Sequence, residues 1–155
     1  MEYQHEIDFI HRTKELLQQY DEYIRLKNLN TKFERHYETT LMINCCVGLL
    51  LVPKEIWKNE LPTEKINEEK WGIDENWISI ETDKSVKRFT EHLRNSVSHY
   101  RFEAINKDNK ISCFIFTDRL KQAKEDNFKV EVQIINLKKF LLKLSDDLLS
   151  IAKQT

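Results

Sequence analysis

Residues 41–52 of the chain read LMINCCVGLLLV, which is the only strongly hydrophobic stretch in the sequence. A helix that crosses a bilayer needs about 20 apolar residues, so this stretch is too short to span a membrane. A helix that is apolar on all sides is typical of a protein interior. We therefore predict a central, buried helix that starts at Lys32, has Thr31 as its N-terminal cap and stops at Pro53.

The composition around this stretch favours further long helices. Only two glycines and two prolines occur among 155 residues, so few positions force a turn. The chain is long enough to bury a core without disulfides or metals, and we expect one domain over residues 1–155. The formal net charge of −1 argues against a broad basic face for nucleic acid, so any RNA site is expected to be small.

Apolar periodicity predicts the remaining elements. Helical spacing predicts three more helices, over residues 5–27, from about residue 82 to Tyr100, and from a cap at Asn136 to about Lys153. Strand patterns predict a small antiparallel sheet, over residues 101–105, 110–117 and 128–134. Between the central helix and the next one we expect a loop fixed by three tryptophans, Trp57, Trp71 and Trp77. The predicted fold class is mainly α, of the α+β type: a bundle of four to five helices with the sheet inserted before the last helix.

The cysteines and the N-terminal residues indicate a cytoplasmic protein without membrane association. Cys45 and Cys46 are adjacent within the apolar stretch, and with Cys113 they suit buried, reduced thiols better than a disulfide framework. Residues 1–10 lack the continuous apolar core of a signal peptide. No Cys/His spacing resembles a zinc site and no glycine-rich phosphate loop occurs, so we expect neither a metal nor another cofactor.

The helix predicted before the sheet carries the side chains best suited to catalysis, Arg94, Asn95 and His99. On a helical wheel of about 100° per residue, these three and Ser98 lie opposite the apolar stripe. That stripe, the expected core face, consists of Val86, Phe89, Leu93, Val97 and Tyr100. The same pattern is also compatible with a solvated helix face that has no function.

The motif Arg-Asn-x-x-x-His resembles that of the HEPN domain family, whose ribonuclease members carry Arg-x-x-x-x-His, commonly with Asn, His or Asp in second place. The resemblance extends to FERHYETTLMINCCVGLLLVPKE (33–55), LRNSVSHYRFEA (93–104) and IFTD (115–118), which look like a subfamily of small stand-alone bacterial and plasmid HEPN proteins. It implies a nearly all-helical fold and a homodimer in which the motif helices of two copies line one cleft. The wheel agrees, since the motif lies on a face that its own core does not use.

The three side chains also suit the cleavage of RNA without a metal. In that reaction the 2′-OH attacks the adjacent phosphorus, which requires a base, an acid and a cation for the developing charge. His99 can supply acid or base chemistry, Arg94 can contact two phosphate oxygens, and Asn95 can orient the imidazole or the phosphate. The expected products are a 2′,3′-cyclic phosphate and a 5′-hydroxyl.

Further candidate RNA contacts surround the motif. The segment 84–101 holds five cations and one anion, a local basic patch that includes Arg88 and Arg101. Ser98 belongs to the same helix face, and Arg35 and His36 stand at the start of the predicted central helix. For each of these residues a solvated surface position is the alternative.

The motif and the resemblance together predict a metal-independent HEPN endoribonuclease. We expect it to act as a homodimer on RNA of its own cell, as a toxin or defence effector, with an antitoxin protein as a candidate partner. The alternative is a noncatalytic HEPN module that binds nucleotide or RNA, or that serves as a dimerising interaction partner.

Overall fold

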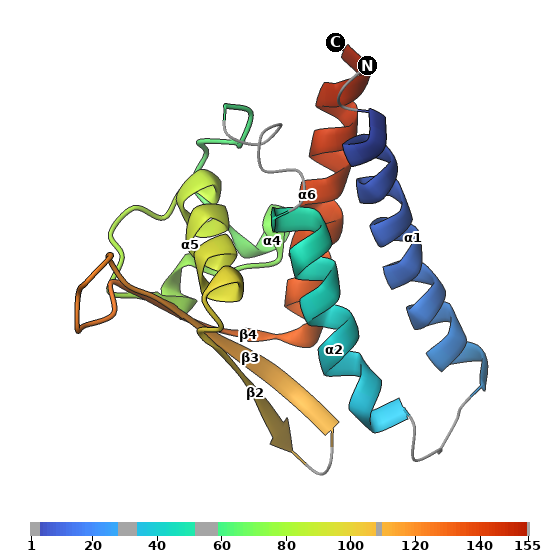
Figure 1. The fold of residues 1–155 in the computed structure, drawn as a ribbon, viewed down its shortest axis with the longest axis horizontal. Coiled ribbons are helices and arrows are strands. Elements are labelled where there is room, and N and C mark those ends of the chain that lie inside the picture. The colour runs from blue at the N-terminus through green and yellow to red at the C-terminus, as the bar shows by residue number, and fades with distance from the viewer. Residues whose placement is uncertain (1–3, 28–33, 52–58, 108–109, 155) are drawn as a thin grey trace.

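The computed structural model describes residues 4–27, 34–51, 59–107 and 110–154 of the chain. It confirms the predicted fold class, because helices dominate and a small antiparallel sheet precedes the last helix (Figure 1). The α-helices are α1 (Gln4–Lys27), α2 (Glu34–Cys46), α4 (Glu68–Trp71), α5 (Val86–Ser98) and α6 (Ile134–Gln154). A π-helical segment η1 (Val47–Leu51) continues α2, and a 3₁₀ turn η2 (Glu75–Trp77) follows α4.

The sheet has four strands in the order β1-β4-β3-β2, and all its neighbours are antiparallel. The strands are β1 (Ile78–Ser79), β2 (Phe102–Lys107), β3 (Lys110–Asp118) and β4 (Phe128–Gln133). In β4, Phe128, Val130 and Val132 are buried while the residues between them are exposed, which confirms the predicted alternation. One face of the sheet therefore packs on the helices and the other meets solvent.

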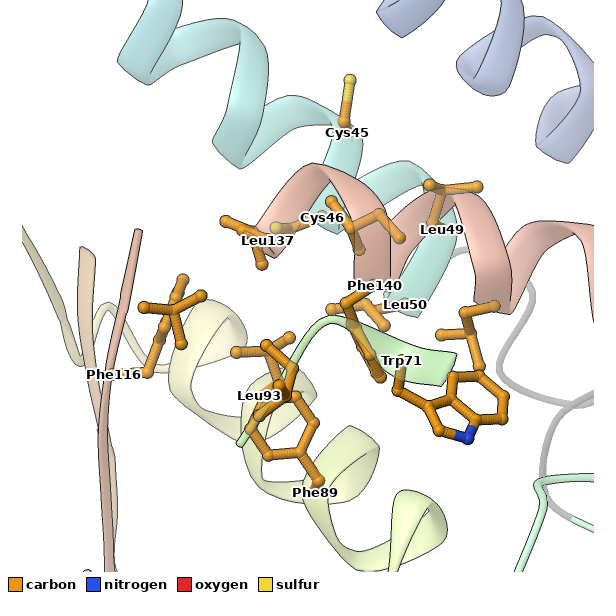
Figure 2. Packing of buried hydrophobic residues seen from close by; sticks show 14 of the residues in the cluster. Cys45, Cys46, Leu49, Leu50, Trp71, Phe89, Leu93, Phe116, Leu137 and Phe140 are labelled. Carbon is orange, nitrogen blue, oxygen red and sulfur yellow. The ribbon is translucent and has the colours of Figure 1, made fainter. Parts of the chain in front are cut away.

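The apolar stretch lies at the centre of the fold, as predicted. Cys45, Cys46 and Leu49 of this stretch belong to the core, and each is 1% exposed or less. Figure 2 shows residues of this segment, of α5 and of α6 meeting in the interior, with Trp71 at one end. Burial raises the pKa of the Cys45 thiol to about 11 and that of Cys46 further still, so both stay protonated and reduced. The predicted cap and stop of the helix lie outside the described residues.

Helices α1 and α6 run side by side (Figure 1). Two ion pairs join them, Lys14 with Asp146 and Lys138 with Asp21. The central segment reaches α1 at Gly48, where a Cβ atom would come within 2.8 Å of the Thr13 hydroxyl oxygen. Glycine is therefore required there for the close approach of the two elements.

The prediction of a loop over residues 53–82 is only partly correct. Its described part contains α4, η2 and the short strand β1, which pairs with β4 through Ile78 and Val130. A strand of two residues has no periodicity of its own, so only the tertiary pairing reveals it. Trp71 is an anchor as predicted: it is fully buried, and its ring centroid lies 6.1 Å from that of Phe140. Trp77 is half-buried against the core, and Trp57 lies outside the described residues.

Two predicted helix starts are wrong by a few residues. Helix α5 begins at Val86 rather than near residue 82, because the Ser85 hydroxyl caps it by accepting a hydrogen bond from Arg88 N. Helix α6 begins at Ile134, so Asn136 lies within its first turn and is not its cap. Instead, the Asn136 amide donates to the Gly72 carbonyl across 2.8 Å and fastens α6 to the end of α4.

Candidate active site at the end of helix α5

Helix α5 turns its apolar stripe inward and leaves the motif on the other side. Val86, Phe89, Leu93 and Val97 are each 4% exposed or less, as the wheel predicts. Arg94 and Asn95 are half-buried, whereas Ser98 and His99 are exposed. The motif thus lies off the core and within reach of a ligand.

The end of α5 has the hydrogen-bond pattern of a Schellman motif. His99 is the capping residue and its N–H donates to the Asn95 carbonyl. Tyr100 N donates to the Val97 carbonyl at 3.3 Å, and Arg101 N donates to the Ser96 carbonyl at 2.8 Å. Tyr100 therefore has a left-handed backbone, with φ of 56°, and is 86% exposed. Its predicted place on the core face is wrong, because α5 ends at Ser98, two residues before Tyr100.

Arg94 and His99 are the two motif residues with free side chains. Neither makes a hydrogen bond or ion pair within the part of the chain that the structure describes. An exposed imidazole can exchange protons with a ligand, and a free guanidinium can offer two donors to a phosphate. The side chains that the proposed chemistry needs are therefore available.

Asn95 differs, because its side chain is already engaged. Its Nδ2 donates to Oδ2 of Asp118, at the end of β3, across 3.1 Å. Asp118 is 3% exposed and also accepts from Arg101 through Oδ1 at 3.3 Å. The backbone N–H of Arg119 donates to the same Oδ1 at 2.8 Å. This carboxylate ties the motif helix to the sheet.

A buried histidine extends this network. His92 is 1% exposed, and its ring nitrogens lie 2.8 Å from Asp118 Oδ2 and 2.6 Å from Glu81 Oε2. Its ring stacks on Phe128 with centroids 4.4 Å apart. Burial opposes ionisation of Glu81, but hydrogen bonds from His92, the Asp83 backbone and Arg88 outweigh it and lower the Glu81 pKa to about 2. Both ring nitrogens face carboxylates, so the imidazole is fully paired when it is protonated.

Two arginines of the predicted basic patch, Arg88 and Arg101, are paired with carboxylates in the structure. Arg88 donates to Glu81 at 3.1 Å and to Glu91 at 3.3 Å, and Arg101 pairs with Asp118. Ser98 has its hydroxyl 3.4 Å from the Asn95 carbonyl. That these residues contact RNA stays a prediction. The same holds for two residues in the first turn of α2, Arg35 and His36, whose side chains lie outside the described part.

A family model described as HEPN pEK499 p136 matches residues 1–155. The chain belongs to this HEPN family. The family assignment made from the motif and its flanking segments is thereby confirmed. No curated protein and no solved structure matches the chain significantly.

The sequence did not predict the hydrogen-bonded network that supports the motif in this HEPN chain, which consists of Glu81, His92 and Asp118. One signal was present: Phe114, Phe116 and Asp118 alternate along β3, so the carboxylate continues a buried face and requires a partner. The identity of that partner could not be predicted, since His92 is 26 residues away in the chain.

An open depression of about 490 Å³ lies at the opposite end of α5. Its lining contains no motif residue and consists of Thr63, Lys65, Glu75, Thr82, Asp83, Lys84 and Ser85. Among the described residues of the HEPN chain, no group of three or more His, Cys, Asp or Glu side chains is arranged to hold a metal ion. None of the described helices has the length and apolar character that a membrane span requires.

Proposed function

We propose that the chain is a metal-independent HEPN endoribonuclease whose active site forms between two copies of α5. The observation that carries this proposal is the contrast between two motif side chains, Arg94 and His99, and the polar side chains around them. The side chains of Arg94 and His99 have no hydrogen-bond or ion-pair partner among the described residues, whereas Arg88, Asn95 and Arg101 are held by carboxylates. A phosphate can therefore bind Arg94 and a hydroxyl of the substrate can exchange its proton with His99, both on a rigid support.

In the proposed reaction His99 exchanges protons and Arg94 neutralises charge. One imidazole takes the proton from the 2′-OH as that oxygen attacks phosphorus, and a second protonates the departing 5′-oxygen. The guanidinium of Arg94 binds the nonbridging oxygens, whose negative charge grows in the transition state. The products are a 2′,3′-cyclic phosphate and a 5′-hydroxyl. Asn95 supports the reaction by its bond to Asp118, which fixes the end of α5 between Arg94 and the cap His99.

The requirement for an acid and a base supports a dimer. His92 is buried with both nitrogens engaged, so the cap residue His99 is the histidine that this end of α5 offers to a ligand. A second copy of the helix would supply the second imidazole. We propose that such a dimer acts on RNA of its own cell as a toxin or defence effector and is restrained by a partner protein.

Cleavage of a labelled single-stranded RNA in the presence of EDTA tests this proposal. We expect the purified protein to yield cyclic-phosphate ends, and Arg94→Ala and His99→Ala to lose at least about 100-fold in rate. Arg12→Ala and His11→Ala are matched controls, because both residues are exposed on α1. Folding and the dimer, followed by circular dichroism and sedimentation, should not change. Cutting of an all-deoxy strand, or full inhibition by EDTA, would contradict the mechanism.

The alternative is a noncatalytic HEPN module, and the same experiment separates the two. Such a module would bind RNA or nucleotide through Arg94 without cutting it. A protein that is monomeric at micromolar concentration would also favour the alternative, because the composite site could not form.

A further inference from the structure

Tyr100 occupies a position that normally favours glycine. It is the residue after the cap of α5, in the left-handed region with φ of 56°, where a bulky side chain strains the backbone. No burial compensates for this strain, since 86% of the residue is exposed. Strained, exposed residues of this kind cluster at functional sites.

The ring of Tyr100 is nevertheless held in place. It stacks on Phe102, with centroids 5.7 Å apart and an angle of 27° between the planes. Phe102 in turn lies against Phe116, at 6.4 Å, and Phe116 is fully buried in the core face of the sheet. The backbone on either side of the ring is fixed as well. Before it, His99 N donates to the Asn95 carbonyl, and after it, Arg101 N donates to the Ser96 carbonyl. An exposed aromatic surface is thus rigidly mounted on the sheet.

This surface directly follows His99 in the chain and shares the end of α5 with Arg94. Unpaired bases of RNA stack on aromatic side chains while the adjoining phosphates contact arginine. Bases within a duplex already stack on one another and offer no free face to such a ring. A ring beside a phosphate site therefore suits single-stranded RNA.

We propose that Tyr100, supported by Phe102, is a stacking site for an unpaired nucleobase adjacent to the scissile phosphate; this inference rests on the proposed ribonuclease function. The site is a binding site, and it takes no part in proton transfer. It makes single-stranded segments the preferred substrate and lets every base bind, because each base has an aromatic face.

Tyr100→Gly gives a test in which function and folding change in opposite directions. Glycine is favoured at this position, so the variant should melt at the same temperature as the wild type or higher. Its affinity for a short single-stranded 2′-O-methyl RNA, which cannot react at its 2′ oxygen, should fall about tenfold. Fluorescence anisotropy measures the affinity. Duplex RNA of the same sequence should bind more weakly than the single strand, with no difference between the variant and the wild type.

Two further variants isolate the aromatic ring. Tyr100→Phe should bind the single strand within about twofold of the wild type, while Tyr100→Leu, which has the same backbone strain, should lose affinity as Tyr100→Gly does. Ile135→Ala, at another exposed apolar residue, should have no effect. Equal binding by the Phe and Leu variants would overturn the stacking site.

The outcomes also separate this inference from the proposed function. Cleavage that depends on Arg94 and His99 but is unchanged in Tyr100→Gly, together with unchanged binding, overturns only the stacking site. Binding that depends on Tyr100 without any cleavage supports the stacking site and overturns the ribonuclease proposal. A protein that binds no single-stranded RNA overturns both.

Discussion

His92 and Asp118 are joined by a 2.8 Å hydrogen bond between Nδ1 and Oδ2, and their side chains are only 1% and 4% exposed. The same carboxylate oxygen accepts from Asn95, so this buried bond is one residue removed from Arg94. Because this hydrogen bond is shielded from water, it holds the helix to the sheet more strongly than a bond at the surface could. The helix that carries the motif is therefore supported by a buried hydrogen-bond network.

Replacing His92 with alanine should destabilise the protein by about 3 kcal/mol, because it leaves two carboxylates without their shared partner. Urea unfolding followed by far-ultraviolet circular dichroism measures the change. His11→Ala is the matched control, since that histidine is exposed, and it should stay within about 0.5 kcal/mol of the wild type. A loss below about 1 kcal/mol for His92→Ala would show that the network contributes little.

Glu81 should make the folded state sensitive to acid. Its pKa is lowered from 4.5 to about 2, so its contribution is complete above pH 4.5 and is lost as the pH falls toward 2. Glu81→Gln removes this titration, and the stability difference between variant and wild type should shrink over that interval. Thermal melts from pH 7 to pH 2 measure it. Glu15→Gln, at an exposed acid on α1, serves as the control, and a constant difference for Glu81→Gln would refute the assignment.

The buried thiols should be inert in the native protein. Burial raises the pKa of Cys45 to about 11 and that of Cys46 above it, so the reactive thiolate is scarce at neutral pH. We expect iodoacetamide to label both residues only on unfolding, as mapped by mass spectrometry of peptides. Labelling of Cys46 in the native state at the rate of a denatured sample would contradict its burial.

The parts of this fold that the sequence predicted are those with a local period. Phe89 and Leu93 recur at helical spacing, and Val130 and Val132 alternate, so each could be placed on a core face. The misses depend on distant partners. Ile78 becomes a strand residue because it pairs with β4. Asn136 was predicted to cap the last helix but lies inside it, since α6 begins at Ile134.

In the candidate site, too, local features could be predicted from the sequence and contacts between distant residues could not. The motif could be found from residue types and spacing, and its exposure from the wheel. The engagement of Asn95 by Asp118 joins residues 23 apart, and no periodicity specifies such a bond. The left-handed turn at Tyr100 was missed for a local reason, since glycine usually marks that position and here it is absent.

The contact between Asn95 and Asp118 restricts which residue can follow Arg94. Aspartate is common at this place in HEPN ribonucleases, but here it would set two carboxylates against each other in a half-buried site. Asn95→Asp should therefore cost about 2 kcal/mol of stability and reduce RNA cleavage together with it.

Exchanging the two groups supplies the decisive variant. In Asn95→Asp with Asp118→Asn, the amide and the carboxylate trade places and the hydrogen bond can re-form with reversed polarity. Asp118→Asn alone also weakens the bond to His92, so full recovery is not expected. The double variant should instead be at least about 1 kcal/mol more stable than the sum of the single losses predicts, as measured by urea unfolding of all four proteins. Strict additivity would mean that the two side chains do not interact, and Asn95 would then be free to contact RNA directly.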